Sequence, residues 1–87
     1  MDKVKEMYEC DGISPGVKYT FIIYDDDKVE LMFYNGAFKV NEPNVRIYDI
    51  GNSGGKRIEY GSGNVKASLP FKRYSDGELD EKWIRIK

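Results

Sequence analysis

Side chains that commonly perform catalysis or bind metals are scarce in this chain. Its 87 residues include no histidine and one cysteine, Cys10. Histidine is the usual general base near neutral pH, so Ser–His and Cys–His arrangements are excluded, and a zinc site is not expected. Without a neighbouring base, Cys10 is expected to be a small apolar residue rather than a nucleophile. The sequence therefore predicts a protein that is not an enzyme, with no cofactor and no bound metal.

Three consecutive carboxylates, Asp25, Asp26 and Asp27, are the densest acidic group. Such a run could hold a hard cation, but consecutive side chains on a short turn point in different directions and the spacing of a calcium loop is missing. A solvated hairpin tip is the favoured interpretation. A carboxylate hydrolase is the least favoured function, because no paired acids on a cleft can be identified.

A glycine-rich segment, residues 51–57, offers groups that hold anions. Backbone amides, small polar side chains and two cations could bind phosphate, and a nearby tyrosine could stack on a base. The segment lacks the ending of a nucleotide-binding P-loop, and a long hairpin connection explains it equally well. The residues of this alternative anion site are Asn52, Ser53, Lys56, Arg57 and Tyr60.

Tyrosines form the most suggestive pattern. Tyr24, Tyr34 and Tyr48 fall on the polar side of their predicted strands, where tyrosines provide rigid amphipathic contact surface. Met32 and Ile22 share that side, so either a partner or a second layer of the protein itself covers it. The predicted partner-binding residues are the three tyrosines with Asp25, Asp26 and Asp27.

The strands that position these residues follow from period-two alternation. Residues 17–24 form the clearest strand, and a loop at 25–27 places Ile23 opposite Val29. Asn35-Gly36 suits a type I′ turn, which would place Phe33 opposite Phe38 and Leu31 opposite Val40.

Further strands are predicted around Val45 and Ile47, at 56–60, 65–71 and 83–86, with a flexible loop at 61–64. Ser75 and Glu78 form a capping box, which predicts a short helix over 76–82. The expected fold is all-β with one short helix, a small antiparallel barrel or two-layer β-sandwich of about six or seven strands, in a single domain, 1–87. Pro70 restricts its strand to an edge or ends its pairing there, and an edge near Pro70 or at 83–87 could pair in a homodimer.

Composition describes an ordinary globular domain, with 40% hydrophobic and 33% charged residues. No long apolar run or signal segment is found, so a cytoplasmic location and no membrane partner are expected. The net charge of −1 divides into −4 for residues 1–43 and +3 for residues 44–87, which could produce an acidic and a basic face or be mixed by folding.

These features together favour a non-catalytic binding protein that recognises and inhibits a larger macromolecule, with a protein as the expected partner. Phage or mobile-element counter-defence and toxin immunity are two settings in which such a protein would act. The alternative function is binding or sequestration of a small anionic ligand, such as a nucleotide or oligonucleotide.

Overall fold

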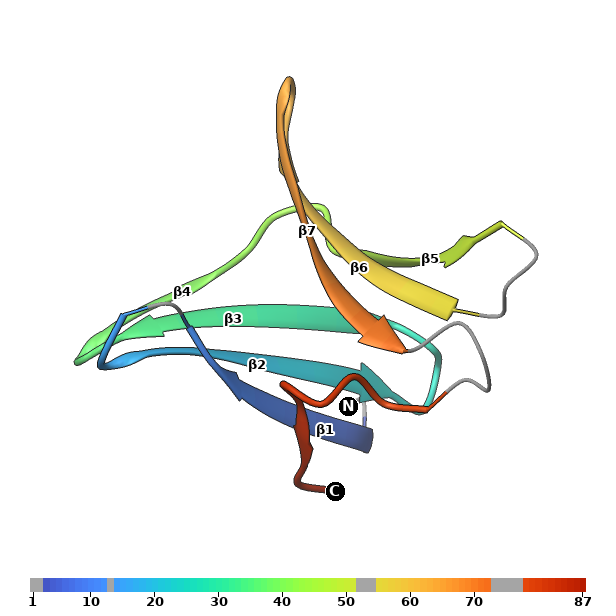
Figure 1. The fold of residues 1–87 in the computed structure, drawn as a ribbon, viewed down its shortest axis with the longest axis horizontal. Helices are drawn as coiled ribbons and strands as arrows, with labels where there is room; N and C mark the ends of the chain where they lie inside the picture. The colour runs from blue at the N-terminus through green and yellow to red at the C-terminus, as the bar shows by residue number, and fades with distance from the viewer. Residues whose placement is uncertain (1–2, 13, 52–54, 73–77) are drawn as a thin grey trace. The chain divides into compact units, whose positions relative to one another are not determined.

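The computed structural model describes residues 3–12, 14–51, 55–72 and 78–87, which contain eight β-strands and no helix (Figure 1). The strands are β1 (Val4–Asp11), β2 (Val17–Tyr24), β3 (Val29–Asn35), β4 (Phe38–Asn41), β5 (Arg46–Ile50), β6 (Gly55–Ser62), β7 (Val65–Lys72) and β8 (Ile84–Arg85).

The chain divides into two compact units. The first comprises Met1–Glu42 and Lys82–Lys87 and holds a five-stranded sheet in the order β4-β3-β2-β1-β8. The second comprises Pro43–Glu81 and holds a three-stranded sheet in the order β5-β6-β7. The strand pairs are antiparallel in both sheets. The predicted all-β class and antiparallel meander are confirmed.

The hairpin between β2 and β3 has the predicted register. Ile23 lies opposite Val29, and the pairs Phe21–Leu31 and Tyr19–Phe33 follow. The amide of Asp27 donates to the carbonyl of Tyr24 at 2.9 Å, and Asp27 adopts a left-handed φ of 66°. A three-residue hairpin loop commonly ends in this conformation. The loop length and the apolar pattern therefore agree on one register.

The hairpin between β3 and β4 differs from its predicted register by two residues. Phe33 lies opposite Val40 rather than Phe38, and Asn35 lies opposite Phe38. The loop is Gly36-Ala37, with φ at 61° for Gly36 and no positive φ at Ala37. Glycine at the first of two loop positions suits a type II′ turn, so the expected type I′ turn at Asn35-Gly36 is wrong. Since the shift is even, every side chain stays on its predicted face.

Two expectations for the second half of the chain are also wrong. Residues 78–82 contain no helix, because Leu79 forms an antiparallel bridge to Lys72 and the amide of Asp80 donates to the carbonyl of Phe71 at 2.7 Å. The remainder of the predicted helix and Ser75 lie outside the described residues. The segment 61–64 is not a flexible loop, since Ser62 still pairs with Val65 and only two residues turn between the strands.

The first unit has its main core on one face of the five-stranded sheet, although Ile22 and Thr20 on the opposite face are buried as well. Phe21 and Leu31 are fully buried in the main core, and the ring of Trp83 lies 6.3 Å from that of Phe21. Tyr8 and Cys10 are buried on the neighbouring strand. This is the predicted apolar side, and it includes Trp83 from the end of the chain.

The second unit buries Ile58 of β6 and Phe71 of β7. Its β7 is the edge strand of the three-stranded sheet, as predicted from Pro70, and on the side away from β6 it is bridged by Leu79 and Asp80 at its end, Phe71 and Lys72.

Candidate binding surface

The five-stranded sheet carries two of the three predicted tyrosines on the face opposite its core. Strand registers place Glu9, Thr20 and Met32 in one row across this face, and Lys18 beside Tyr34 in the next. Ile84 joins the first row opposite Glu9. We call this surface the tyrosine face; its members are Met7, Glu9, Lys18, Thr20, Ile22, Tyr24, Met32, Tyr34 and Ile84.

Both tyrosines are half-buried and their hydroxyl groups have partners. The Tyr24 hydroxyl donates to Glu30 Oε2 at 2.9 Å, and the Tyr34 hydroxyl lies 3.7 Å from Met32 Sδ. Such contacts restrict the rings before any partner arrives, which lowers the entropy lost on binding. Met32 and Ile22 share this face, as predicted.

The last strand adds exposed aliphatic surface beside this face. Ile84 is 67% exposed and Ile86 is 52% exposed. The amides of Ile86 and Lys87 both donate to the carbonyl of Met7, at 2.7 and 3.2 Å, so the chain end is held against β1. Ile84 thus adds an exposed apolar side chain to the face that carries Tyr24 and Tyr34, at the opposite edge of the sheet from Tyr34. Sequence reasoning assigned neither isoleucine to the site, although alternation in 83–86 is the signal that could have done so.

A shallow depression of about 450 Å³ lies on the tyrosine face. It is lined by Glu9, Lys18, Thr20 and Tyr34 together with two turn glycines. Lys39 places its ammonium group 5.7 Å from the centre of the Tyr34 ring, where a cation is attracted to the aromatic face. The surroundings of Tyr34 are therefore polar and partly cationic, and they extend to Glu9, which lies opposite Ile84.

The three aspartates form an exposed tip next to Tyr24. Asp26 accepts a hydrogen bond from the amide of Lys28 at 3.1 Å, and Asp27 lies 3.5 Å from Lys5 Nζ. Asp25 has no ion pair among the described residues. Nor do three Asp, Glu, Cys or His side chains gather as a possible metal site anywhere in that part of the chain. The tip therefore supplies negative charge at one end of the tyrosine face.

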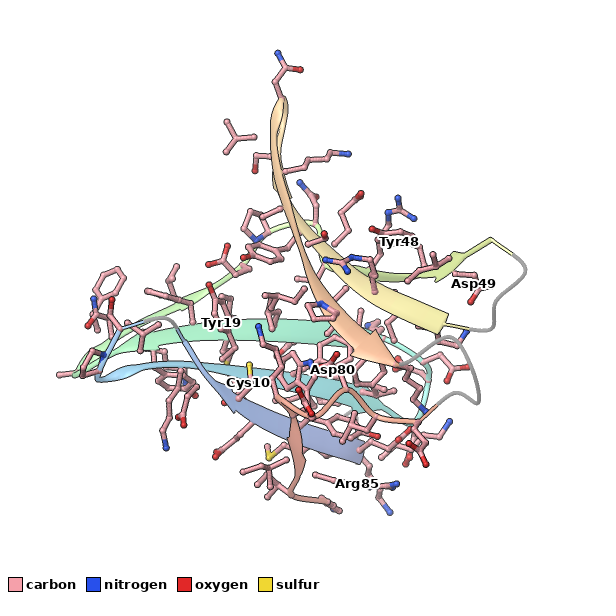
Figure 2. The ribbon with its side chains drawn as sticks, viewed as in Figure 1. Cys10, Tyr19, Tyr48, Asp49, Asp80 and Arg85 are labelled. Carbon is pink, nitrogen blue, oxygen red and sulfur yellow. The ribbon has the colours of Figure 1, made fainter. Side chains whose placement is uncertain are left out.

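Tyr48 does not join the other two tyrosines in one sheet. It lies on β5 of the second unit, where Figure 2 labels it beside Asp49. The guanidinium of Arg46 lies 5.0 Å from the centre of its ring, and Arg57 is its cross-strand partner. Tyr48 thus belongs to a second, cationic surface in the other unit.

The predicted anion site does not assemble in the described residues. Asn52 and Ser53 lie outside them. Lys56 and Arg57 are neighbours on a strand, so their side chains point to opposite faces, and Lys56 Nζ is paired with Asp49 Oδ1 at 2.5 Å. Tyr60 shares the face of Lys56. The strand separates Arg57 from both of these residues.

Folding mixes the acidic and basic halves of the sequence. Lys82, Arg85 and Lys87 return to the first unit, which thereby has eight basic and nine acidic residues, or −1. The second unit has six of each, or zero. Charge on this protein is therefore organised by sheet faces rather than by halves of the chain.

A charged cluster on the core side of the five-stranded sheet holds Tyr8 in its protonated form. Burial, the hydrogen bond that its hydroxyl donates to Glu6 and the charge of Glu6 together raise the pKa of Tyr8 to about 12. Arg85 opposes this shift, with its guanidinium 5.8 Å from the Tyr8 ring centre and 3.8 Å from Glu6. Through these contacts, Arg85 of β8 helps to hold β8 against Glu6 and Tyr8 of β1.

Comparison with known proteins found no matching family model, no similar curated protein and no similar solved structure. Within the described ranges, no helix has the length and apolar character required to cross a membrane.

Proposed function

We propose that this protein is a non-catalytic binding protein that recognises and inhibits a larger protein through its tyrosine face. The observation that carries the proposal is that exposed Ile84 and half-buried Tyr24 and Tyr34 share one sheet face, the face opposite the main core. Aromatic anchors with adjacent apolar area are typical of protein-binding hot spots.

The charges around this face indicate the chemistry of the partner. Exposed aspartates stand at one end, beside Tyr24, and Lys18 and Lys39 stand near Tyr34. A complementary partner has an apolar centre that covers Ile84 and Ile86, with basic residues opposite the aspartate tip. Charge at the edges would determine orientation, whereas the apolar centre would provide most of the affinity.

The proposal is tested with purified protein as bait in lysate, comparing wild type with Tyr34→Ala and Ile84→Ser. We expect one stoichiometric protein partner, whose affinity falls roughly 30-fold or more in a hot-spot variant, corresponding to about 2 kcal/mol. Tyr34→Phe retains the ring and should retain most binding. The matched control is Val65→Ser, because Val65 is 81% exposed but lies on the other sheet.

Circular dichroism of each variant separates loss of contact from loss of fold. Equal binding by Ile84→Ser, Tyr34→Ala and Val65→Ser would contradict the proposal. Recovery of a nucleotide with no protein partner would contradict it as well, and would favour the anionic-ligand alternative.

A further inference from the structure

The sheet of the second unit has a face on which positive charge exceeds negative charge. Strand registers place Arg46, Arg57 and Lys66 on this face with a single carboxylate, Glu59. Glu59 lies between Arg46, at 2.8 Å, and Lys66, at 3.9 Å, and the hydrogen bond from Arg46 is the main cause that lowers its pKa. Three cations against one carboxylate leave a formal excess of two positive charges.

Arg57 is the cation of this face that no carboxylate neutralises within the described ranges. Its Nε and Nη2 both donate to Ser68 Oγ, at 3.2 and 3.1 Å. A hydroxyl group orients the guanidinium without cancelling its charge. Ser68 occupies the Nε–Nη2 edge of the guanidinium, which leaves the Nη1–Nη2 edge for an anion with several acceptor oxygens, such as a phosphate.

Tyr48 provides an aromatic surface within the same cationic environment. Its ring lies beside Arg46, with 5.0 Å between the guanidinium carbon and the ring centre, and it faces Arg57 across the strands. Arg46 and Lys66 remain accessible, with side chains 57% and 56% exposed. An aromatic ring between guanidinium groups on an open sheet suits stacking of a base whose phosphates contact the cations.

We propose that this face of β5, β6 and β7 binds single-stranded nucleic acid, with a base on Tyr48 and phosphates at Arg57, Arg46 and Lys66. Neighbouring strands lie about 4.8 Å apart, so the two outer strands are about 10 Å apart and the site covers only a few nucleotides. A duplex hides its base faces and could use only the charges. The site is distinct from the tyrosine face, and the proposal is independent of the one made for that face.

The test measures fluorescence anisotropy of a labelled oligothymidylate of 15 nucleotides, about the longest site of one small fold. Two or three phosphate contacts predict that log affinity falls with log salt with a slope of about −1.4 to −2. Arg57→Gln should make that slope shallower by about 0.7, the loss of one contact. Lys3→Gln removes the same charge from an exposed residue of the first unit and should leave the slope unchanged.

Stacking is tested separately at Tyr48. Tyr48→Phe should retain binding, whereas Tyr48→Ala should weaken it about fivefold or more. The proposal is overturned if Arg57→Gln and Lys3→Gln change the slope equally, if a matched duplex binds as tightly as the single strand, or if oligoglutamate displaces the oligonucleotide at equal charge concentration. Retained binding in Tyr48→Phe together with a shallower slope in Arg57→Gln supports it even if Tyr48→Ala unfolds.

Discussion

Replacing Trp83 with alanine should remove a large part of the stability of the first unit. Trp83 is only 4% exposed, and its ring packs against that of Phe21, which is completely buried. Truncating a buried tryptophan to alanine typically costs about 3–5 kcal/mol. A domain of this size has roughly 4–13 kcal/mol of total stability, so the loss is about a quarter of the total or more.

Urea denaturation followed by far-ultraviolet circular dichroism is the appropriate assay, because Trp83 is the single tryptophan and its fluorescence disappears in the variant. With an m-value of about 1 kcal/mol/M, the midpoint should fall by roughly 3 M or more. Trp83→Phe keeps an aromatic ring beside Phe21 and should lose less. If the variant is unfolded without urea, the stability of Trp83→Phe provides the measurement.

Ile84→Ala is the matched control, since Ile84 follows Trp83 but is 67% exposed. Exposed substitutions usually change stability by about 0.5 kcal/mol or less. Equal midpoints for Trp83→Ala and Ile84→Ala would refute the reasoning, because the ring contact would then contribute nothing to holding the C-terminal segment in the five-stranded sheet. The proposed binding surface depends on that segment, as Ile84 and Ile86 belong to it.

Two further predictions concern the turn at Asp27 and the ionisation of Tyr8. Asp27→Gly should increase the free energy of unfolding by up to about 1 kcal/mol and raise the melting temperature by a few degrees. The reason is that Asp27 has a left-handed φ of 66°, while its ion pair with Lys5 is exposed. A lower melting temperature would show that the ion pair outweighs the backbone strain. The pKa of Tyr8 is raised to about 12 in the folded protein, above the value of about 10 in the unfolded chain. The preference of the folded state for protonated Tyr8 therefore stabilises the fold fully below pH 10, and this contribution to stability is lost as pH rises toward 12. Tyrosinate absorbance should show Tyr8 ionising near pH 12, and in Glu6→Gln this step should move to lower pH; an unchanged step would contradict the contribution of the Glu6 charge.

The β2–β3 hairpin was predictable because two independent constraints agree on it. Alternation places Phe21 and Leu31 on one face, and the three aspartates set the loop length. The next hairpin lacked a second constraint, since Asn35-Gly36 and Gly36-Ala37 both suit two-residue turns and both keep every side chain on its face. Contacts outside the hairpin accompany the observed register: the amide of Gly36 donates to the carbonyl of Gly16 at 3.1 Å. Such contacts are not visible in a local pattern.

The helix prediction failed for a related reason. A capping box at Ser75 and Glu78 involves only local hydrogen bonds. In the structure, the backbones of Leu79 and Asp80 instead pair with β7. Tertiary pairing routinely overrides a short helical preference, since an isolated helix of one or two turns is unstable in water.

Tyr48 shows that the alternation of side chains along a strand does not predict which sheet the strand joins, and this matters for function. Alternation predicts which way a side chain faces along its own strand, but the identity of the sheet depends on pairing with distant strands. Tyr24 and Tyr34 share a sheet with exposed Ile84, whereas Tyr48 pairs with Arg57 in the other unit. Rings that look equivalent in the sequence thus lie on a face of mixed charge with an exposed aliphatic residue on one sheet, and on a face with excess positive charge on the other. A protein partner and a nucleic acid are the respective ligands that these surroundings favour, so variants of Tyr34 and Tyr48 should affect the two kinds of binding separately.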